Sequence, residues 1–171
     1  MGARRPPQLE EVTALSLTDA PALDLDGLQD LLGFQLRMAQ ITVHRDFAAT
    51  MAEAGLTQKQ LATLMLIRAN PGVSQADIAA LLGTDRATMM ALIDRLADRD
   101  LVERRRSNTD RRRQELHLTA TGKTFLVKCD RLLAEHEARF TSRFSEKELK
   151  ALFAALARLH GQEEIMPSEL R

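Results

Sequence analysis

The 171-residue chain has no tryptophan and no tyrosine, and it contains one cysteine, Cys129. A single cysteine excludes an intrachain disulfide and a cysteine-rich metal site. Glycine is also sparse, with 8 residues, so the composition favours a largely helical interior built from aliphatic side chains. The length is sufficient for one domain with a substantial core.

Net charge is absent as well, because 24 Lys and Arg residues balance 24 Asp and Glu residues. Any affinity for nucleic acid must therefore come from local charge, which argues against a protein that coats nucleic acid generally. No apolar run is long enough to span a bilayer, and residues 1–9 lack the apolar stretch of a signal peptide. We expect a cytoplasmic protein that has no membrane partner.

The local charge lies in residues 104–113, where the sequence RRRSNTDRRR holds six arginines and one acid. The run falls between two short β-like segments, residues 101–103 and 114–118, and this arrangement predicts the tip of a hairpin. Guanidinium groups at such a tip can meet a phosphate backbone. A basic run by itself is weak support, because most charge runs are solvated surface.

Three helix-sized segments precede the hairpin, and together with it they predict a winged helix-turn-helix. The first begins with the capping-box pair Thr57 and Gln60 and ends at residues 70–72, Asn-Pro-Gly. The second begins at Ser74, ends at Gly83 and is expected to bury three apolar side chains, Ile78, Leu81 and Leu82. The third, capped by Thr84, carries a core stripe at helical spacing, formed by Met89, Leu92, Ile93 and Leu96.

In a helix-turn-helix, the second of the two close helices enters the major groove. That helix covers residues 84 to about 98. On its outward face Arg86 suits guanine and Thr88 several bases, whereas Ala87 and Met90 can pack on thymine methyl groups. At the start of the preceding helix, Ser74 and Gln75 are expected to hold a phosphate. The predicted DNA contacts upstream of the hairpin are Ser74, Gln75, Thr84, Arg86, Ala87, Thr88, Met90, Ala91 and Arg95.

The hairpin and the residues after it carry a longer motif. Asp110, Arg111 and Arg112, followed by an apolar-x-apolar pair and by Thr119 and Gly122, are similar to the D-R-R, apolar-x-apolar, T-x-x-G signature of the MarR family of bacterial winged-helix regulators. The wider resemblance covers roughly residues 28–160. It implies that Asp110 braces the wing and that either Arg111 or Arg112 enters the minor groove. Arg106 is a further candidate for DNA contact.

Two positions depart from the family pattern. Asp100 stands where glycine often precedes the first wing strand, and aspartate tolerates a left-handed turn less easily, so we expect a turn of different shape. Met90 and Ala91 stand where many members have a polar or basic pair, which lowers the number of hydrogen bonds available to bases. The operator preference of other members therefore does not carry over.

Long helices outside the DNA-binding unit need a surface to cover their apolar faces, and a second copy of the chain supplies one. We expect helices over residues 27–54 and 121–144 and a last helix that begins with the capping-box pair Ser145 and Glu148. A homodimer with two-fold symmetry would place two recognition helices about one DNA turn apart. The expected partner is double-stranded DNA that carries a pseudo-palindromic operator.

The predicted fold class is mainly α. It is a winged helix-turn-helix, residues 55–119, with a small β-hairpin wing and long N- and C-terminal dimerisation helices, residues 27–54 with 120–161. These parts make up a MarR-like domain over residues 25–171. Residues 1–24 form an N-terminal arm that either crosses to the partner or stays disordered.

A regulator needs a signal such as a bound ligand. His44 and His136 are polar groups on apolar helix faces and could contact one. A histidine in such a place is more often a satisfied core or interface residue than a ligand contact. In the family, small aromatic acids and related compounds bind between the first, second and fifth helices. By that resemblance, the candidate ligand contacts are Arg37, Gln40, His44, Phe47, Gln60, Leu64 and His136. The resemblance implies a repressor that leaves DNA when a small aromatic acid, phenol or acyl-thioester favours a splayed dimer.

Other functions find less support in the sequence. The four histidines, His44, His117, His136 and His160, lack metal-ligand spacing, and neither a metal nor a cofactor is indicated. Residues 122–124, Gly-Lys-Thr, look like the end of a phosphate-binding loop, but His117 stands where its first glycine is required, so we expect no enzyme. Cys129 lies on an apolar stripe and is expected to be buried, with redox sensing as the alternative. The alternatives for function are a winged-helix module whose basic hairpin docks an acidic protein, and a MarR-like activator.

Overall fold

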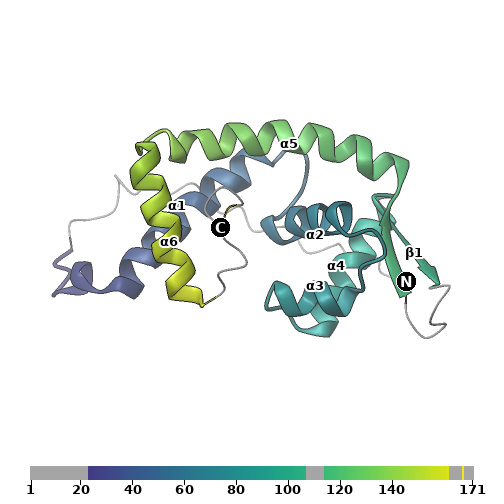
Figure 1. The fold of residues 1–171 in the computed structure, drawn as a ribbon, viewed down its shortest axis with the longest axis horizontal. Coiled ribbons are helices and arrows are strands. Elements are labelled where there is room, and N and C mark those ends of the chain that lie inside the picture. Colours follow the sequence, from purple (N-terminus) through teal and green to yellow (C-terminus); the bar gives the residue numbers. More distant parts are fainter. Residues whose placement is uncertain (1–22, 107–113, 162–166, 168–171) are drawn as a thin grey trace, which may run out of the picture. The chain divides into compact units, whose positions relative to one another are not determined.

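The computed structural model describes residues 23–106, 114–161 and 167. Its elements are η2 (Leu28–Asp30), α1 (Leu32–Thr50), α2 (Gln58–Ala69), α3 (Gln75–Leu81), α4 (Arg86–Asp98), β1 (Val102–Arg106), β2 (Gln114–Leu118), α5 (Ala120–Thr141) and α6 (Glu146–His160) (Figure 1). Two units are distinguished, the described part of residues 1–38 and that of residues 39–171. The predicted fold class, mainly helical with one small antiparallel hairpin, is confirmed.

Three helices begin at the caps that the sequence predicts. Thr57 and Gln60 form a capping box at α2, in which the Gln60 N–H donates to Thr57 Oγ1 (3.3 Å) and the Thr57 N–H donates to Gln60 Oε1 (2.9 Å). Ser145 and Glu148 make the same reciprocal pair at α6. Ser74 caps α3. These side chains satisfy backbone donors that the first turn of a helix leaves unpaired.

The cap of α4 lies one residue later than predicted. Asp85, and not Thr84, is the N-cap, because its backbone is extended and its carboxylate accepts from the Thr88 N–H (2.9 Å). The Thr84 hydroxyl instead donates to the Leu82 carbonyl oxygen (3.3 Å). Thr84 is therefore engaged with the end of the preceding helix, and α4 begins at Arg86.

The first long helix is shorter than predicted at both ends. Gly27 adopts a φ of 82°, η2 follows it, and Leu31 is extended, so α1 begins only at Leu32. At its other end α1 stops at Thr50, and residues 51–55 form a turn that includes Gly55 with a φ of 60°. Glycine reaches this left-handed conformation without the clash that a Cβ would introduce.

α3 buries fewer side chains than predicted. Ile78 is 1% exposed, whereas Leu81 is 50% exposed, so the prediction for Leu81 was wrong. The physical reason is the length of the helix, because Leu81 is the last residue of α3 and the chain turns immediately after it. Leu82, in that turn, packs against the core in its place.

The hairpin pairs β1 with β2, with Val102 opposite Leu118 and Arg104 opposite Leu116. Directly opposite residues of an antiparallel pair lie on the same face, and the buried Val102, Leu116 and Leu118 define the face that packs on the core. β1 is longer than predicted and ends at Arg106. Residues 104–106 therefore lie in a paired strand, which corrects the prediction that the whole basic run forms the hairpin tip.

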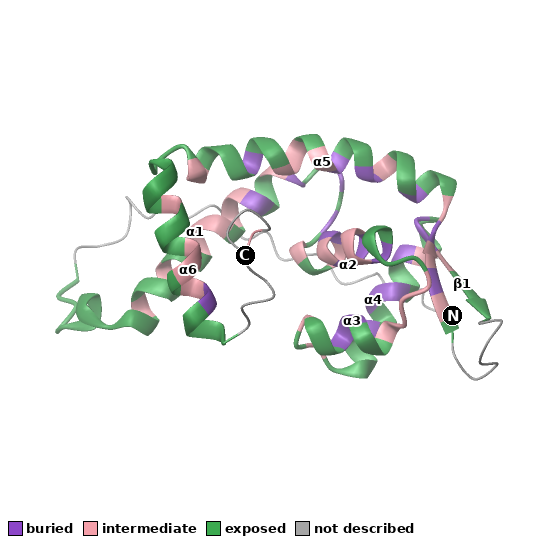
Figure 2. Cartoon of the chain, in the orientation of Figure 1, coloured by how far each residue is buried: buried purple, intermediate pink, exposed green. Residues whose placement is uncertain are grey.

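The core of residues 39–171 is formed mainly by α2, α4, the hairpin and α5, where Figure 2 shows most of the buried positions. Its largest fully buried side chains include Met51, Leu64, Ile67, Met89, Ile93, Leu96 and Leu126. α6 differs, since Ala157 is its one buried residue. Figure 2 shows most of this helix as exposed. In the part of the chain that the structure describes, no helix has both the length and the apolarity needed to cross a bilayer.

Candidate nucleic-acid interface

α4 has an exposed face opposite its core stripe. The predicted stripe is buried, with Leu92 the most accessible member at 8% and Met89, Ile93 and Leu96 at 0%. The exposed face carries Arg86, Ala87, Thr88, Met90, Ala91 and Arg95. A helix that buries one face and leaves the other accessible along its length can enter the major groove of DNA.

The accessible start of α4 contains a carboxylate that sequence reasoning did not single out. Asp85 Oδ2 accepts from the Thr88 hydroxyl (2.6 Å), and Asp85 Oδ1 accepts from the Thr88 N–H (2.9 Å). The Thr88 side-chain hydrogen bond is the largest influence on Asp85 and, with the backbone bonds, lowers its pKa. The Thr88 hydroxyl proton is thereby engaged, so its oxygen can accept from a base more readily than it can donate.

The start of α3 carries the two residues predicted to hold a phosphate. Ser74 and Gln75 are both half-buried. Ser74 Oγ accepts from the Asp77 N–H (3.2 Å) and donates to Asp77 Oδ2 (2.7 Å). Because this hydroxyl already caps the helix, a phosphate at this position would depend on Gln75 and on backbone N–H groups.

The described arginines of the hairpin are partly neutralised by acids. Arg105 lies opposite Glu115 in the register and also forms an ion pair with Glu103. Arg104 belongs to the other face, where its Nη2 lies 2.6 Å from Asp94 Oδ1 of α4. Cross-strand pairs of opposite charge stabilise a sheet modestly. The basic run therefore brings less uncompensated charge to this part of the hairpin than its sequence suggests.

The remaining wing candidates differ in whether the structure describes them. Arg106 is exposed at the end of β1. Asp110, Arg111 and Arg112 lie outside the described residues, and their predicted roles stay predictions.

The hairpin is joined to α5 through a compact set of contacts around Thr119. Thr119 caps α5 by accepting from the Gly122 N–H (2.9 Å), and its hydroxyl donates to the Asp100 carbonyl oxygen (2.6 Å). An ideal Cβ on Gly122 would lie 2.1 Å from the Leu101 carbonyl oxygen, so only glycine allows α5 to approach this closely. The T-x-x-G pattern in the sequence is thus explained by one cap and one backbone approach.

The turn at Asp100 corrects a prediction. Asp100 has a φ of 55°, which is the left-handed conformation that glycine adopts readily, so the turn does not differ in the expected way. Its Oδ2 accepts from the Thr121 hydroxyl (2.8 Å). Aspartate is one of the few residues with a Cβ that visit this region, because its short polar side chain can bond locally.

The candidate ligand contacts fall into groups that differ in exposure. Arg37, Gln40 and His44 are exposed on α1, and Arg37 belongs to the unit of residues 1–38. Phe47 (4%), Leu64 (0%) and His136 (2%) are buried. Gln60 is half-buried and engaged in the capping box of α2. The three buried side chains can contact a ligand only if the packing around them opens.

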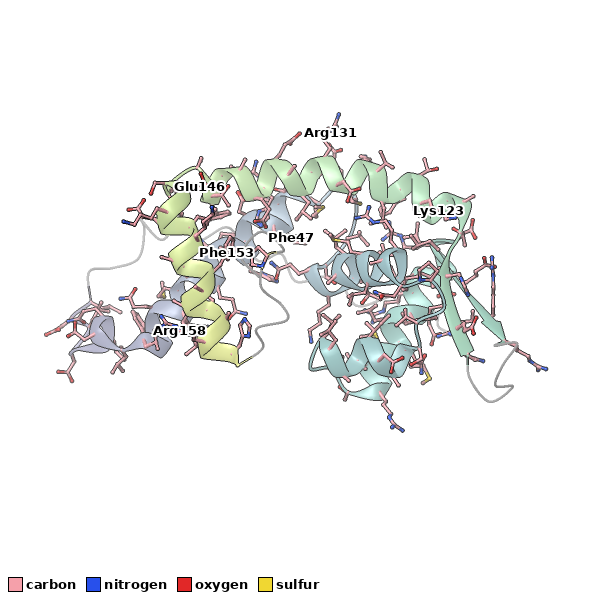
Figure 3. All side chains as sticks on the ribbon, viewed as in Figure 1. Phe47, Lys123, Arg131, Glu146, Phe153 and Arg158 are labelled. Carbon is pink, nitrogen blue, oxygen red and sulfur yellow. The ribbon has the colours of Figure 1, made fainter. Side chains whose placement is uncertain are left out.

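His136 is held by a polar cluster that the sequence did not reveal. Its Nδ1 lies 2.6 Å from Asp46 Oδ2, and its ring packs edge-on against Phe47 and Phe140, with centroids 5.5 Å and 5.3 Å away. Arg139 Nε donates to both Asp46 oxygens (2.9 and 3.1 Å), and Arg139 also donates to Thr50 Oγ1. In Figure 3, Phe47 lies on the inner side of α5 and Arg131 points away on its outer side.

The charge state of Asp46 follows from two opposed influences. Burial is the largest single one and raises its pKa, but the hydrogen bonds and charges of Arg139 and His136 together outweigh burial, and the pKa is lowered. Asp46 is therefore a carboxylate at neutral pH. This cluster ties α1 to α5 across 90 positions of sequence.

Cys129 is 0% exposed within α5, as the apolar stripe predicts. Burial, and secondarily the charge of Asp130, raises the pKa of its thiol. A buried thiol with a raised pKa is a poor nucleophile, which disfavours the redox-sensing alternative. Within the described residues, no group of three or more His, Cys, Asp or Glu side chains could hold a metal ion.

Comparison with known sequences places these features in a family. A sequence model of the MarR family matches residues 54–113. A protein of Thauera aromatica, named for transcriptional regulation of the hcr operon, is 34% identical over 141 residues, which are 82% of this chain and 85% of that protein. The HTH-type transcriptional regulator MgrA of Staphylococcus aureus is 27% identical over 137 residues, which are 80% of this chain and 92% of MgrA.

Solved structures agree with this assignment. The transcriptional repressor CouR bound to a 23-mer DNA duplex is 38% identical, with 82% of this chain and 99% of that chain covered and a TM-score of 0.77. CouR bound to p-coumaroyl-CoA is 36% identical, with 83% and 99% covered and a TM-score of 0.74. The chain belongs to the MarR family and is a transcriptional regulator of that type.

Proposed function

We propose that this protein is a homodimeric repressor that binds a pseudo-palindromic operator and is released from it by a small aromatic effector. The observation that carries the proposal is the exposed face of α4, on a chain 38% identical to a repressor bound to a DNA duplex. Arg86 would read a base edge from this face, and Arg106, Arg111 and Arg112 of the wing would contact the backbone or the minor groove.

Apolar surface on α6 supports the dimer. Leu152 (39%) and Leu159 (51%) are exposed on this helix, and Phe144 (43%) lies just before it. Large exposed apolar side chains that gather on one helix are typical of an interface. A two-fold dimer would present two copies of α4 to half-sites centred about 10 base pairs apart.

The relative bound to p-coumaroyl-CoA supports an aromatic acyl-thioester, or the related acid or phenol, as the effector. The exposed Gln40 and His44 would meet the polar part of the ligand, whereas Phe47 and Leu64 would hold the ring once the helices part. A ligand that binds the splayed dimer more tightly than the DNA-bound dimer shifts the population toward release.

Specific DNA binding should be steeply salt-dependent and should use Arg86. With DNA from upstream of the protein's own gene, we expect affinity to fall at least 100-fold between about 50 and 200 mM salt. Arg86→Ala should cost about 1–3 kcal/mol of discrimination against competitor DNA. Mobility shifts at both salt concentrations measure both effects. Arg131→Ala, which removes an exposed arginine from the outer side of α5, is the matched control and should leave both values unchanged.

Salt-insensitive binding, or equal losses for the Arg86 and Arg131 variants, would contradict the DNA-binding proposal. Such a result would favour a winged-helix module that docks a protein.

The effector proposal predicts that p-coumaroyl-CoA weakens the DNA complex. We expect the apparent Kd for the duplex to rise at least about fivefold when the ligand is saturating, as typical allosteric coupling allows. Titrations with coenzyme A alone and with free p-coumarate separate the thioester from its two halves. A duplex affinity that stays constant with all three compounds would refute p-coumaroyl-CoA and its two halves as effectors.

A further inference from the structure

Arg99 connects three segments that are distant in sequence. It is the C-cap of α4, the helix whose exposed face carries Arg86. Its Nη1 donates to the Gly55 carbonyl oxygen (2.9 Å), and its Nη2 donates to the Ala54 carbonyl oxygen (2.8 Å). The same guanidinium lies over the Phe125 ring of α5, 5.2 Å from the centroid. The end of α4 is thereby fixed to both the α1–α2 connection and α5.

The chemistry of this junction requires arginine. The carbonyl groups of residues 54 and 55 lie in the turn that follows the end of α1, and both accept from Arg99. The guanidinium is a planar fork whose two ends can bond two neighbouring acceptors while its face stacks on an aromatic ring. A lysine ammonium can retain the charge, but it cannot hold both carbonyls and stack at once. The contact therefore fixes an orientation in addition to supplying an attraction.

The position of Arg99 in the chain makes this orientation matter for α4. Asp100, the next residue, is in the left-handed turn, and Leu101 begins the close contact with Gly122 of α5. Arg99 thus holds the last turn of α4 against the α1–α2 connection. The contacts around Thr119 hold the start of the hairpin against α5. A helix pinned at its C-terminal end by side-chain contacts can change its tilt only if those contacts change.

We propose that Arg99 is a positioning residue, which fixes the tilt of α4 relative to the α1–α2 connection and α5 and so determines how well the α4 face discriminates its operator. This inference rests on the proposed function. Arg99 would act without touching DNA, because its guanidinium is engaged with Ala54, Gly55 and Phe125. Loss of the Arg99 contacts should leave the arginines that meet phosphates in place. It should misalign the exposed face of α4 with the base edges.

The chain offers a closely matched control in Arg143. Its Nε donates to the Arg139 carbonyl oxygen (3.0 Å), and its guanidinium lies 5.0 Å from the Phe140 centroid. These are the same two kinds of contact, but all of the partners belong to the C-terminal end of α5. Arg143→Met therefore removes an equal charge and an equal stacking contact without loosening α4.

The test uses the full-length protein and a duplex that the wild type selects from a random library. Affinity is measured for that duplex and for a scrambled duplex of equal composition, beside the melting temperature of each variant. We expect Arg99→Met to weaken binding to the selected duplex about tenfold, with less than about a twofold change for the scrambled one. Arg99→Lys keeps the charge and the aliphatic stem. It should lower the ratio of the affinity for the selected duplex to that for the scrambled duplex by at least about threefold. Arg143→Met should change neither affinity.

A purely structural role would lower the melting temperature and both affinities in parallel, and that outcome would overturn the inference. An unchanged ratio for Arg99→Lys would also overturn it, and this variant decides the matter if Arg99→Met does not fold. A wild-type protein that enriches no sequence would refute the proposed function itself, and the inference with it. Failure of the inference can be observed only with a duplex that the wild type has selected. Failure of the proposed function yields no selected duplex, so the two failures are distinguishable.

Discussion

Replacing Gly122 with alanine should lower the melting temperature by roughly 6–12 °C, which corresponds to a loss of about 3 kcal/mol in the free energy of unfolding. The new Cβ would lie 2.1 Å from the Leu101 carbonyl oxygen and 2.9 Å from its carbon. Both are backbone atoms, so no side-chain rotation relieves the overlap. The Leu101 carbonyl also accepts from the Thr119 N–H (3.3 Å), and displacing it weakens the link between the hairpin and α5.

Gly33→Ala is the matched control for this substitution. Gly33 is also in the first turn of a long helix, and no described atom lies within 4 Å of an ideal Cβ on it. Alanine is a better helix former than glycine, so this variant should be stabilised by up to about 1 kcal/mol. Thermal unfolding of both variants measures the contrast. Equal melting temperatures for Gly122→Ala and the wild type would mean that α5 does not approach Leu101 in the way described.

Replacing Asp46 with alanine should destabilise the protein by about 2 kcal/mol, because Nδ1 of the buried His136 would lose its hydrogen-bond partner. Most of this loss comes from His136, which is 2% exposed, since an unpaired buried polar group costs more than an exposed one. Arg139 has 44% of its side chain exposed and can be hydrated, so it adds little. Urea denaturation at neutral pH measures the loss.

Asp130→Ala is the control for Asp46→Ala. It removes an exposed ion pair and so shows how much stability is lost when no buried histidine is involved. Asp130 and Arg68 are 2.6 Å apart, but 42% and 40% of their side chains are exposed. An exposed pair of this kind contributes at most about 1 kcal/mol. Equal destabilisation by the Asp46 and Asp130 variants would mean that the buried histidine does not depend on Asp46.

The pH dependence of the same cluster has a defined direction. The pKa of Asp46 in the folded protein lies below its ordinary value of 3.8, so the folded state favours the carboxylate. The resulting stability is complete above the ordinary pKa and is lost as pH falls through the lowered one. In Asp46→Asn, which cannot titrate at this position, the loss in free energy of unfolding relative to wild type should shrink as the pH falls below about 4. A loss that does not shrink between about pH 4 and pH 2 would contradict the lowered pKa of Asp46.

Features that depend on residues a few positions apart could be predicted from the sequence. The capping boxes at Thr57 and Ser145 involve partners three residues away, and the core stripe of α4 repeats with the helical period. Where two neighbouring side chains could both cap, the local pattern was insufficient. Thr84 and Asp85 both suit the N-cap, and the choice depended on the Thr84 hydroxyl bonding back to Leu82.

Contacts between distant segments could not be predicted in this way. Asp46 meets His136 across 90 positions and Arg99 meets Gly55 across 44, and no spacing rule identifies either pair. The candidate DNA contacts on α4 followed from the period of the helix, but the acids that pair with Arg104 and Arg105 became evident only with the hairpin register. The roles of Asp110, Arg111 and Arg112 still rest on the sequence resemblance.

The burial of Cys129 has a practical consequence for measuring how this protein moves. Because the natural thiol is 0% exposed and its pKa is raised, thiol-reactive dyes should leave the native wild-type protein unlabelled. A cysteine introduced at an exposed site such as Ala91 on α4 would then be the single attachment point for a fluorophore or spin label in each chain. Distances between the two copies of α4 in a dimer could be followed in solution without first removing any native residue.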